Sequence, residues 1–208
     1  MISVNLNDVW NLTEEDIILA INEVTKEIIN YLESRKNNSF DMKRFGEMYN
    51  DFGAITSYWV GNTYVGEIKS NNLKNAFNLL FSSFMRLLLF LKSNKNNSSL
   101  ENKLYINGLY TGKLYRYLGN GDSQNERTIE VEYDNLYVSW TKKSRVPYIE
   151  SKLYGDYIIL SAMADDEQQG IDIHALQIGR PFEGEVIFPT YKNKIICVSK
   201  VKREDSYE

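Results

Sequence analysis

Apolar residues in the first part of the chain recur at spacings of three and four, which is the period of an α-helix. The first stripe of this kind runs from Ile17 to Leu32. It follows Thr13, whose hydroxyl can cap a helix, and the acidic residues 14–16, which favour the positive end of the helix dipole. The pattern therefore predicts a helix that ends near Lys36.

Three further segments belong to this part of the chain. A short helix is predicted over 41–51, after a polar break at 37–39. Residues 57–65 place aromatic and β-branched residues on both sides of Gly61-Asn62, a pattern that predicts a β-hairpin. Residues 73–91 are apolar on nearly every side, which predicts a buried helix.

The pattern changes after the polar segment 93–99, which carries no hydrophobic period and is the best candidate for a boundary. Beyond it, short apolar and aromatic runs separated by turn residues predict strands. The predicted strands cover Leu114–Leu118, Leu136–Trp140, Tyr157–Ala162, Glu185–Phe188 and Lys194–Val201. The expected fold class is α+β, with a helical region over 1–99 and a mostly antiparallel β core over 100–208, packed as one compact unit.

Composition places the chain among ordinary globular proteins, with 43% hydrophobic and 25% charged residues. Its 208 residues can form one substantial core, or a helical region joined to a β-rich one. The net charge of -4 argues against non-specific binding of nucleic acid, although it does not exclude a local basic groove. Cys197 is the single cysteine, so no intramolecular disulfide can form, which fits a reducing cytosol.

The same residues argue against several classes of protein. The start of the chain has no basic segment followed by an apolar one, which predicts no secretion signal. The most apolar run, from Phe77 to Leu91, has 15 residues and includes Arg86, so it is too short and too polar to span a bilayer. We therefore expect a cytoplasmic protein without a membrane partner. One cysteine and one histidine supply neither a conventional zinc site nor a well-founded catalytic triad, so no metal is expected and His174 is expected to be structural.

Charged and hydroxyl side chains interrupt three of the predicted strands. Arg116 lies within an apolar and aromatic run, and its planar guanidinium suits a phosphate or a carboxylate. Ser139 and Thr141 are separated by one residue, so their hydroxyls share one strand face. Glu183 and Glu185 also share a face, where two like charges are costly unless a cation or a reaction uses them. Taken singly, each element also has an ordinary explanation as a surface feature.

Together and in this order, the three elements resemble the mono-ADP-ribosyltransferase family of the arginine–serine–glutamate type. That family has an arginine on the first core strand, Ser-x-Ser or Ser-x-Thr on the second, and Glu- or Gln-x-Glu at the start of a later strand. The segment Gly170-Ile171-Asp172-Ile173, followed by residues 183–189, is similar to the family ending G-[IV]-D-[IV] … E-x-E-V-[LI]-x-P. The resemblance covers roughly residues 104 to 204. It departs from the family pattern at Tyr117-Leu118, which separate the arginine from Gly119, and at the bulky Trp140.

The resemblance implies that NAD is the co-substrate and that it binds in a cleft of the β core. Arg116 would pair with the NAD phosphates, Ser139 would orient the catalytic acid, and Trp140 and Thr141 would complete the cofactor-binding strand. Glu185 would hold the 2′-hydroxyl of the nicotinamide ribose and stabilise positive charge as the glycosidic bond breaks.

The resemblance also implies an acceptor site. Glu183 would position or deprotonate the acceptor and Phe182 would dock it, which favours a target protein modified on arginine. An RNA acceptor stays open, because the chemistry needs only a nucleophile. A phage-encoded modifier or an intracellular toxin held by a regulator or antitoxin fits these features. A non-catalytic interaction module on the same scaffold and an NAD glycohydrolase are the alternatives.

Overall fold

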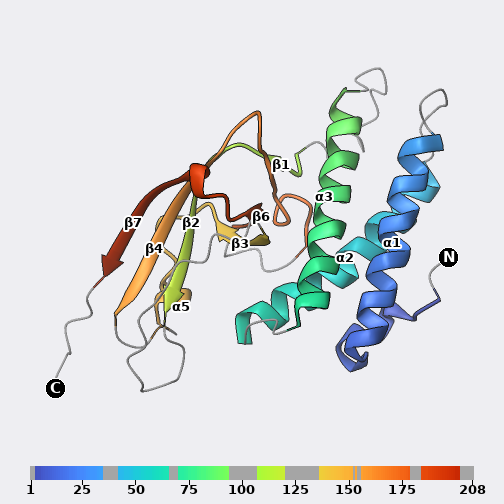
Figure 1. Cartoon of the computed structure of the whole chain (residues 1–208), viewed down its shortest axis with the longest axis horizontal. Helices are drawn as coiled ribbons and strands as arrows, with labels where there is room; N and C mark the ends of the chain where they lie inside the picture. The colour runs from blue at the N-terminus through green and yellow to red at the C-terminus, as the bar shows by residue number, and fades with distance from the viewer. Residues whose placement is uncertain are drawn as a thin grey trace. The chain divides into compact units, whose positions relative to one another are not determined.

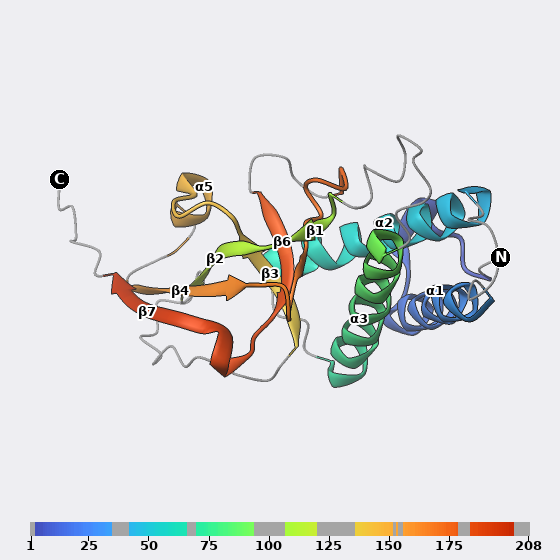
Figure 2. The ribbon, with the colours of Figure 1, turned by 90° about the horizontal axis from the view of Figure 1, so that it is seen from above.

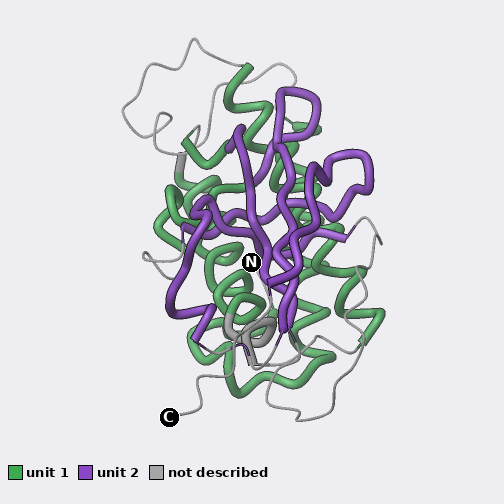
Figure 3. The backbone as a smooth tube through the Cα atoms, turned by 90° about the vertical axis from the view of Figure 1, so that its left-hand side faces the viewer, with its two compact units in different colours: residues 1–109, 171–181 green, residues 110–170, 182–208 purple. Residues whose placement is uncertain are grey.

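The computed structural model describes residues 3–34, 42–65, 70–93, 107–119, 136–151, 153, 156–178 and 184–201. The chain divides into two compact units, coloured separately in Figure 3. The first unit comprises residues 1–109 and 171–181, and the second comprises 110–170 and 182–208. The boundary between the units therefore falls between residues 109 and 110, whereas the sequence pattern predicted it between 99 and 100. Residues 171–181 belong to the same unit as the helices. Helices come first and a mostly antiparallel sheet follows, so the predicted α+β class is confirmed.

The first unit is built from three long helices. They are α1 (Glu14–Ser34), α2 (Met42–Val65) and α3 (Asn71–Ser93), preceded by the 3-10 helix η1 (Leu6–Asn11) (Figure 1). The predicted cap of α1 is confirmed, because the amide of Asp16 donates to the Thr13 hydroxyl and the amide of Thr13 donates to the Asp16 carboxylate, both at 3.2 Å. The predicted breaks at 37–39 and after residue 93 lie outside the described residues, apart from Ser93 itself, which ends α3.

Helix α2 corrects two predictions. It runs without interruption from Met42 to Val65, so the helix expected over 41–51 is too short and the hairpin expected over 57–65 is wrong. The physical reason is a buried stripe at helical spacing, formed by Phe45, Met48, Phe52, Ile55 and Trp59. Burying this stripe outweighs the strand and turn preferences of the residues around Gly61-Asn62.

Helix α3 packs its large side chains against α1 and α2. Phe52 of α2 stacks on Phe84, and Trp59 meets Phe81 edge-on with 5.2 Å between ring centroids. By length and composition α3 could cross a membrane, but 56% of its apolar window is buried, so its role as a core helix accounts for the composition. Leu79 and Leu89 are exposed, so α3 is buried on most sides but not on all.

A seven-stranded sheet has the order β1-β5-β6-β3-β2-β4-β7. Figure 2 shows β7 beside β4 at one edge of this sheet. All five predicted strands are confirmed, and the pairings of β2 with β3 and β4, of β3 with β6 and of β4 with β7 are antiparallel. In this part of the chain, two short strands and two short helical segments were not predicted. The elements are β1 (Leu109–Tyr110), β2 (Gly112–Gly119), β3 (Tyr137–Thr141), α5 (Pro147–Glu150), β4 (Tyr157–Ala164), β5 (Gly170–Ile171), β6 (Glu185–Pro189), η2 (Lys192–Lys194) and β7 (Ile195–Val201).

One face of the sheet carries the core of the second unit. Its buried members are Leu114, Trp140, Ile158, Leu160, Ala162, Ala164, Val186 and Phe188. The Trp140 indole packs edge-on against Phe188 and donates a hydrogen bond of 3.0 Å to the Phe188 carbonyl oxygen. Strands β3 and β6 are thus joined by side chains as well as by their backbone ladder, which fixes their register.

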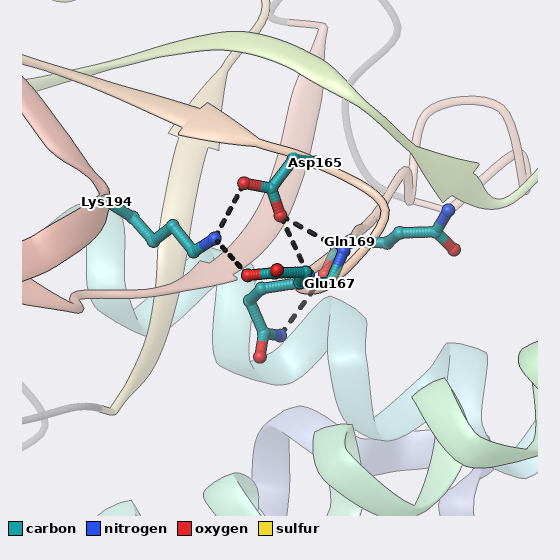
Figure 4. Close-up of polar contacts among 5 residues, drawn as sticks. Asp165, Glu167, Gln169 and Lys194 are labelled. Atoms are coloured by element: carbon teal, nitrogen blue, oxygen red, sulfur yellow. Dashed lines mark hydrogen bonds and ion pairs between the residues drawn. The ribbon is translucent and has the colours of Figure 1, made fainter.

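A polar contact joins the turn after β4 to Lys194, the last residue of η2 (Figure 4). Lys194 Nζ lies 2.6 Å from Asp165 Oδ2 and 3.6 Å from Glu167 Oε2. The Asp165 carboxylate also accepts the backbone amides of Glu167 and Gln168. The hydrogen bond from Lys194 lowers the pKa of Asp165, and the same bond raises the pKa of Lys194. The Lys194 side chain is 14% exposed and the Asp165 side chain 42% exposed, so this partly buried contact holds the turn after β4 against Lys194.

Two neighbouring leucines of α3 test the packing of the first unit. Leu88 is fully buried, whereas Leu89 is 42% exposed. We expect Leu88→Ala to lower the free energy of unfolding by about 2 to 5 kcal/mol, because it leaves a cavity. Leu89→Ala should change it by no more than about 0.5 to 1 kcal/mol. Urea denaturation followed by circular dichroism measures both values, and similar losses in the two variants would contradict the assigned orientation of α3.

Candidate functional site

The three strands that carry the predicted site lie side by side in the second unit. Glu185 opens β6, Ser139 and Thr141 lie on β3, and Arg116 lies on β2, in the sheet order β6-β3-β2. Ser139 and Glu185, which are 46 positions apart in the chain, therefore lie on adjacent strands, and Arg116 lies on the strand beyond. Phe182 and Glu183 lie outside the described residues.

The central contact is a hydrogen bond from the Ser139 hydroxyl to Glu185 Oε1. Thr141 is the direct cross-strand partner of Glu185, and Ser139 follows two residues away on the same face of β3. Glu185 is 3% exposed, so its carboxylate lies in a site from which bulk water is largely excluded. Electrostatic interactions are stronger in such a site than in water.

Glycine at position 184 has a specific structural role directly before Glu185. Gly184 has a φ of +63°, in the left-handed region that favours glycine. Its carbonyl oxygen accepts the amide of Lys142 at 3.0 Å, so the pairing of β3 with β6 continues one residue beyond Glu185. On the opposite strand the Thr141 hydroxyl accepts the amide of Lys143 at 3.0 Å. The backbone on both sides of the Thr141–Glu185 pair is thus held by hydrogen bonds.

Arg116 contacts the main chain of the serine strand. Its Nη1 donates a hydrogen bond of 2.9 Å to the carbonyl oxygen of Ser139. Among the described residues a single register pair, Tyr115 with Thr141, joins β2 to β3, so the guanidinium adds a second connection between these strands. Arg116 is the cross-strand partner of the core residue Leu160, whereas Tyr115 shares the face of Thr141 and Glu185. The described contact of Arg116 therefore positions Ser139.

The Trp140 side chain lies on the core face of β3. It is 2% exposed and packs against Phe188, on the side of the strand opposite to the hydroxyls of Ser139 and Thr141. The structure therefore gives the indole a packing role, while its neighbours in sequence line the face of Glu185.

The segment after β3 is anchored to β2 through Tyr117. The Tyr117 hydroxyl donates to the Ser144 carbonyl oxygen at 2.9 Å and approaches Glu150 Oε1 at 3.4 Å. Burial and the charge of Glu150 raise the pKa of Tyr117 to about 12, so the phenol stays a neutral donor at physiological pH. Arg145 pairs with the other oxygen of Glu150 at 3.2 Å. These contacts hold the chain that follows Thr141 against the sheet.

The structure also places on the Glu185 face two residues that the sequence analysis did not single out. Tyr115 lies directly opposite Thr141, and Lys113 follows two residues away on the same face of β2. Their alternation with Leu114 was visible in the sequence, but the register that sets them on the same face as Glu185 was not.

A pocket formed by described residues lies in the first unit. It is lined by Glu23, Val24, Glu27, Arg44, Glu47, Met48 and Asp51. Burial raises the pKa of Asp51, and the charges of Glu47 and Glu27 act in the same direction. Arg44 forms a 2.8 Å ion pair with Glu27. Four carboxylates against one guanidinium do not suit the phosphates of a dinucleotide.

Comparisons of the chain with protein-family models, with curated proteins and with solved structures find no match. Within the part of the chain that the structure describes, no group of three histidine, cysteine or carboxylate side chains is arranged to hold a metal ion. Any functional assignment therefore rests on the strand geometry and on the order of the motifs.

Replacing Gly184 tests whether its backbone conformation supports the site. A Cβ at this position would meet the Lys142 and Lys143 side chains at 3.6 Å and beyond, so there is space for it and the cost is conformational. We expect Gly184→Ala to destabilise the protein by about 1 to 2 kcal/mol. Gly46→Ala in helix α2, where nothing lies within 4 Å, should stabilise it by up to about 1 kcal/mol. Chemical denaturation measures both changes, and equal signs would contradict the left-handed conformation of Gly184.

Proposed function

We propose that this chain is a mono-ADP-ribosyltransferase, which transfers ADP-ribose from NAD to a macromolecular acceptor. The observation that carries the proposal is the hydrogen bond between Ser139 and the buried carboxylate of Glu185 on adjacent strands. Two features support it: the arginine strand lies next to the serine strand, and the motifs occur in the order of the family that the sequence resembles.

The proposed reaction breaks the glycosidic bond between C1′ of the nicotinamide ribose and the ring nitrogen. The bonding electrons leave with nicotinamide, which becomes neutral, and positive charge develops on the ribose. Glu185 stabilises this oxocarbenium-like charge and accepts the 2′-hydroxyl of the ribose in a hydrogen bond. The Ser139 hydroxyl holds the carboxylate in one orientation, so little reorganisation is needed when the charge develops.

Arg116 contributes through the contact that the structure describes. By holding the Ser139 carbonyl oxygen, it fixes the serine that orients Glu185. The family resemblance also implies that Arg116 pairs with an NAD phosphate. Its cross-strand partner Leu160 belongs to the core face, opposite to Glu185, so the proposal rests on its contact with Ser139.

The acceptor side of the proposal rests on Phe182 and Glu183, which precede Glu185 in the sequence and lie outside the described residues. A nucleophile, which we propose to be the guanidinium group of a target-protein arginine, attacks C1′ and loses a proton to Glu183, while Phe182 docks the target. RNA is the alternative acceptor. We further propose that the protein acts in the cytoplasm of the producing or infected cell, as a toxin or phage-encoded modifier with a regulator or antitoxin as partner.

A labelled-NAD assay tests the proposed function. Incubation of the protein with a cell lysate and NAD labelled in the adenylate moiety should attach label to macromolecules. Release of free ADP-ribose alone would instead indicate an NAD glycohydrolase, and no turnover of NAD would indicate an interaction module. RNase and protease treatment of the product separates an RNA acceptor from a protein acceptor.

Glu185→Gln should abolish transfer while leaving the fold intact. Removing the charge that stabilises the transition state is expected to lower the rate by about 100-fold or more. The matched control is Glu167→Gln, because the Glu167 side chain is 90% exposed and lies at the turn after β4. Near-UV circular dichroism verifies the fold of both variants. If Glu185→Gln retained the wild-type rate, the catalytic assignment would be wrong.

Glu183→Gln separates the two halves of the reaction. If Glu183 serves the acceptor, this variant should lose transfer to an arginine analogue such as agmatine while keeping most of its NAD hydrolysis. Measuring ADP-ribosylated agmatine and free ADP-ribose in the same sample gives both rates. Equal losses in the two rates would remove the acceptor role from Glu183.

A further inference from the structure

A row of side chains crosses five adjacent strands on the face of the sheet that carries Glu185. Each member is the direct cross-strand partner of the next: Glu185, Thr141, Tyr115, Ser161 and Cys197. Direct partners share a face, so these side chains emerge on the same side of β6, β3, β2, β4 and β7. The carboxylate of the proposed function therefore belongs to a longer row of side chains than the sequence motifs indicate, in which Glu185, Thr141 and Ser161 are buried.

Tyr115 and Lys113 form a paired aromatic and cationic element on this face. Lys113 Nζ lies over the Tyr115 ring, 5.3 Å from its centroid. Tyr115 is half-buried and Lys113 is exposed, whereas Thr141 and Glu185 are buried. On this face, exposure therefore decreases from Lys113 and Tyr115 on β2 to the enclosed carboxylate of Glu185 on β6.

The distance between Glu185 and Tyr115 suits a dinucleotide. Tyr115 lies two strands from Glu185, and strands in a sheet are about 4.8 Å apart, so the two backbones are separated by about 10 Å. In NAD, a diphosphate and two riboses separate the nicotinamide from the adenine over a distance of this order. A molecule whose nicotinamide ribose meets Glu185 can place its adenylate half beside Tyr115 and Lys113.

Another lysine–tyrosine pair among the described residues does not offer the same match. Lys142 Nζ lies 5.8 Å from the centroid of Tyr110, but Tyr110 packs against the core cluster that contains Trp140 and Phe188. That cluster occupies the face of the sheet opposite to Glu185. The register therefore selects Tyr115 with Lys113 as the pair that shares a face with the carboxylate.

We infer that Tyr115 and Lys113 form the binding site for the adenylate half of NAD. Tyr115 stacks on the adenine ring, and the Lys113 ammonium pairs with the adjacent phosphate. This inference rests on the proposed function, because it takes NAD as the ligand. It assigns recognition of the distal half of the molecule to residues outside the Arg, Ser-x-Thr and Glu-x-Glu motifs.

Comparing NAD with nicotinamide mononucleotide tests the inference, because the mononucleotide has the same scissile bond but no adenylate. Tyr115→Ala should raise KM for NAD by about 5- to 100-fold, the effect expected when a stacking ring is lost. The same variant should leave kcat/KM for the mononucleotide within about twofold. Tyr115→Phe keeps the ring and should restore the wild-type KM. Tyr191→Ala is the control, because it removes another half-buried tyrosine of the same unit.

Titration with ADP-ribose provides a readout that does not depend on turnover. Isothermal titration calorimetry should show that Tyr115→Ala weakens binding by a similar factor and that Tyr115→Phe does not. Equal effects of Tyr115→Ala on NAD and on the mononucleotide, or unchanged ADP-ribose affinity, would overturn the inference while leaving the proposed function standing. If the wild-type protein cleaves neither substrate but the titration behaves as expected, the proposed reaction fails and the binding site stands. If the wild-type protein does not bind ADP-ribose, the binding site is refuted.

Discussion

The antiparallel pairing of β3 with β6 is the constraint on which the candidate site depends. Five consecutive residues of each strand are paired, and the Trp140 indole adds a hydrogen bond to the Phe188 carbonyl. This register places Thr141 opposite Glu185 and brings the Ser139 hydroxyl to its carboxylate. A shift by one residue would move the carboxylate to the core face, where an unpaired charge is very costly. The same register of β3 against β6 therefore packs the core on one face and forms the candidate site on the other.

The two faces of the sheet carry different kinds of side chain. The core face carries Leu114, Trp140, Leu160 and Phe188, and their burial stabilises the second unit. The opposite face carries the hydroxyls, the carboxylate and the ring of Tyr115. Arg116 joins these roles, because it starts from the core side of β2 and reaches the backbone of Ser139 at the seam between the strands. Its described contact reaches the carboxylate face through the position of that serine.

The helical unit illustrates how packing overrides local preference. Residues 57–65 have the composition of a hairpin, yet they continue α2, because Trp59 completes a buried stripe that begins at Phe45. Local propensities differ by a few tenths of a kcal/mol per residue, whereas burying one large aromatic side chain contributes about 1.5 to 3 kcal/mol. The long strands and the helices α1 and α3 were predictable, because in those segments the local pattern and the packing agree.

The sequence by itself determined the class of the fold, the five long strands, the cap of α1 and the identity of the polar residues that interrupt the strands. These are local properties, which follow from the periodicity and the chemistry of neighbouring residues. Only the tertiary structure decided which strands are neighbours and in which register they pair. That choice is made by contacts between residues far apart in the chain, such as Ser139 with Glu185 and Arg116 with Ser139. It is also what sets Tyr115 and Lys113 on the face of the carboxylate, because the face of a side chain depends on its partner strand and not on its own segment.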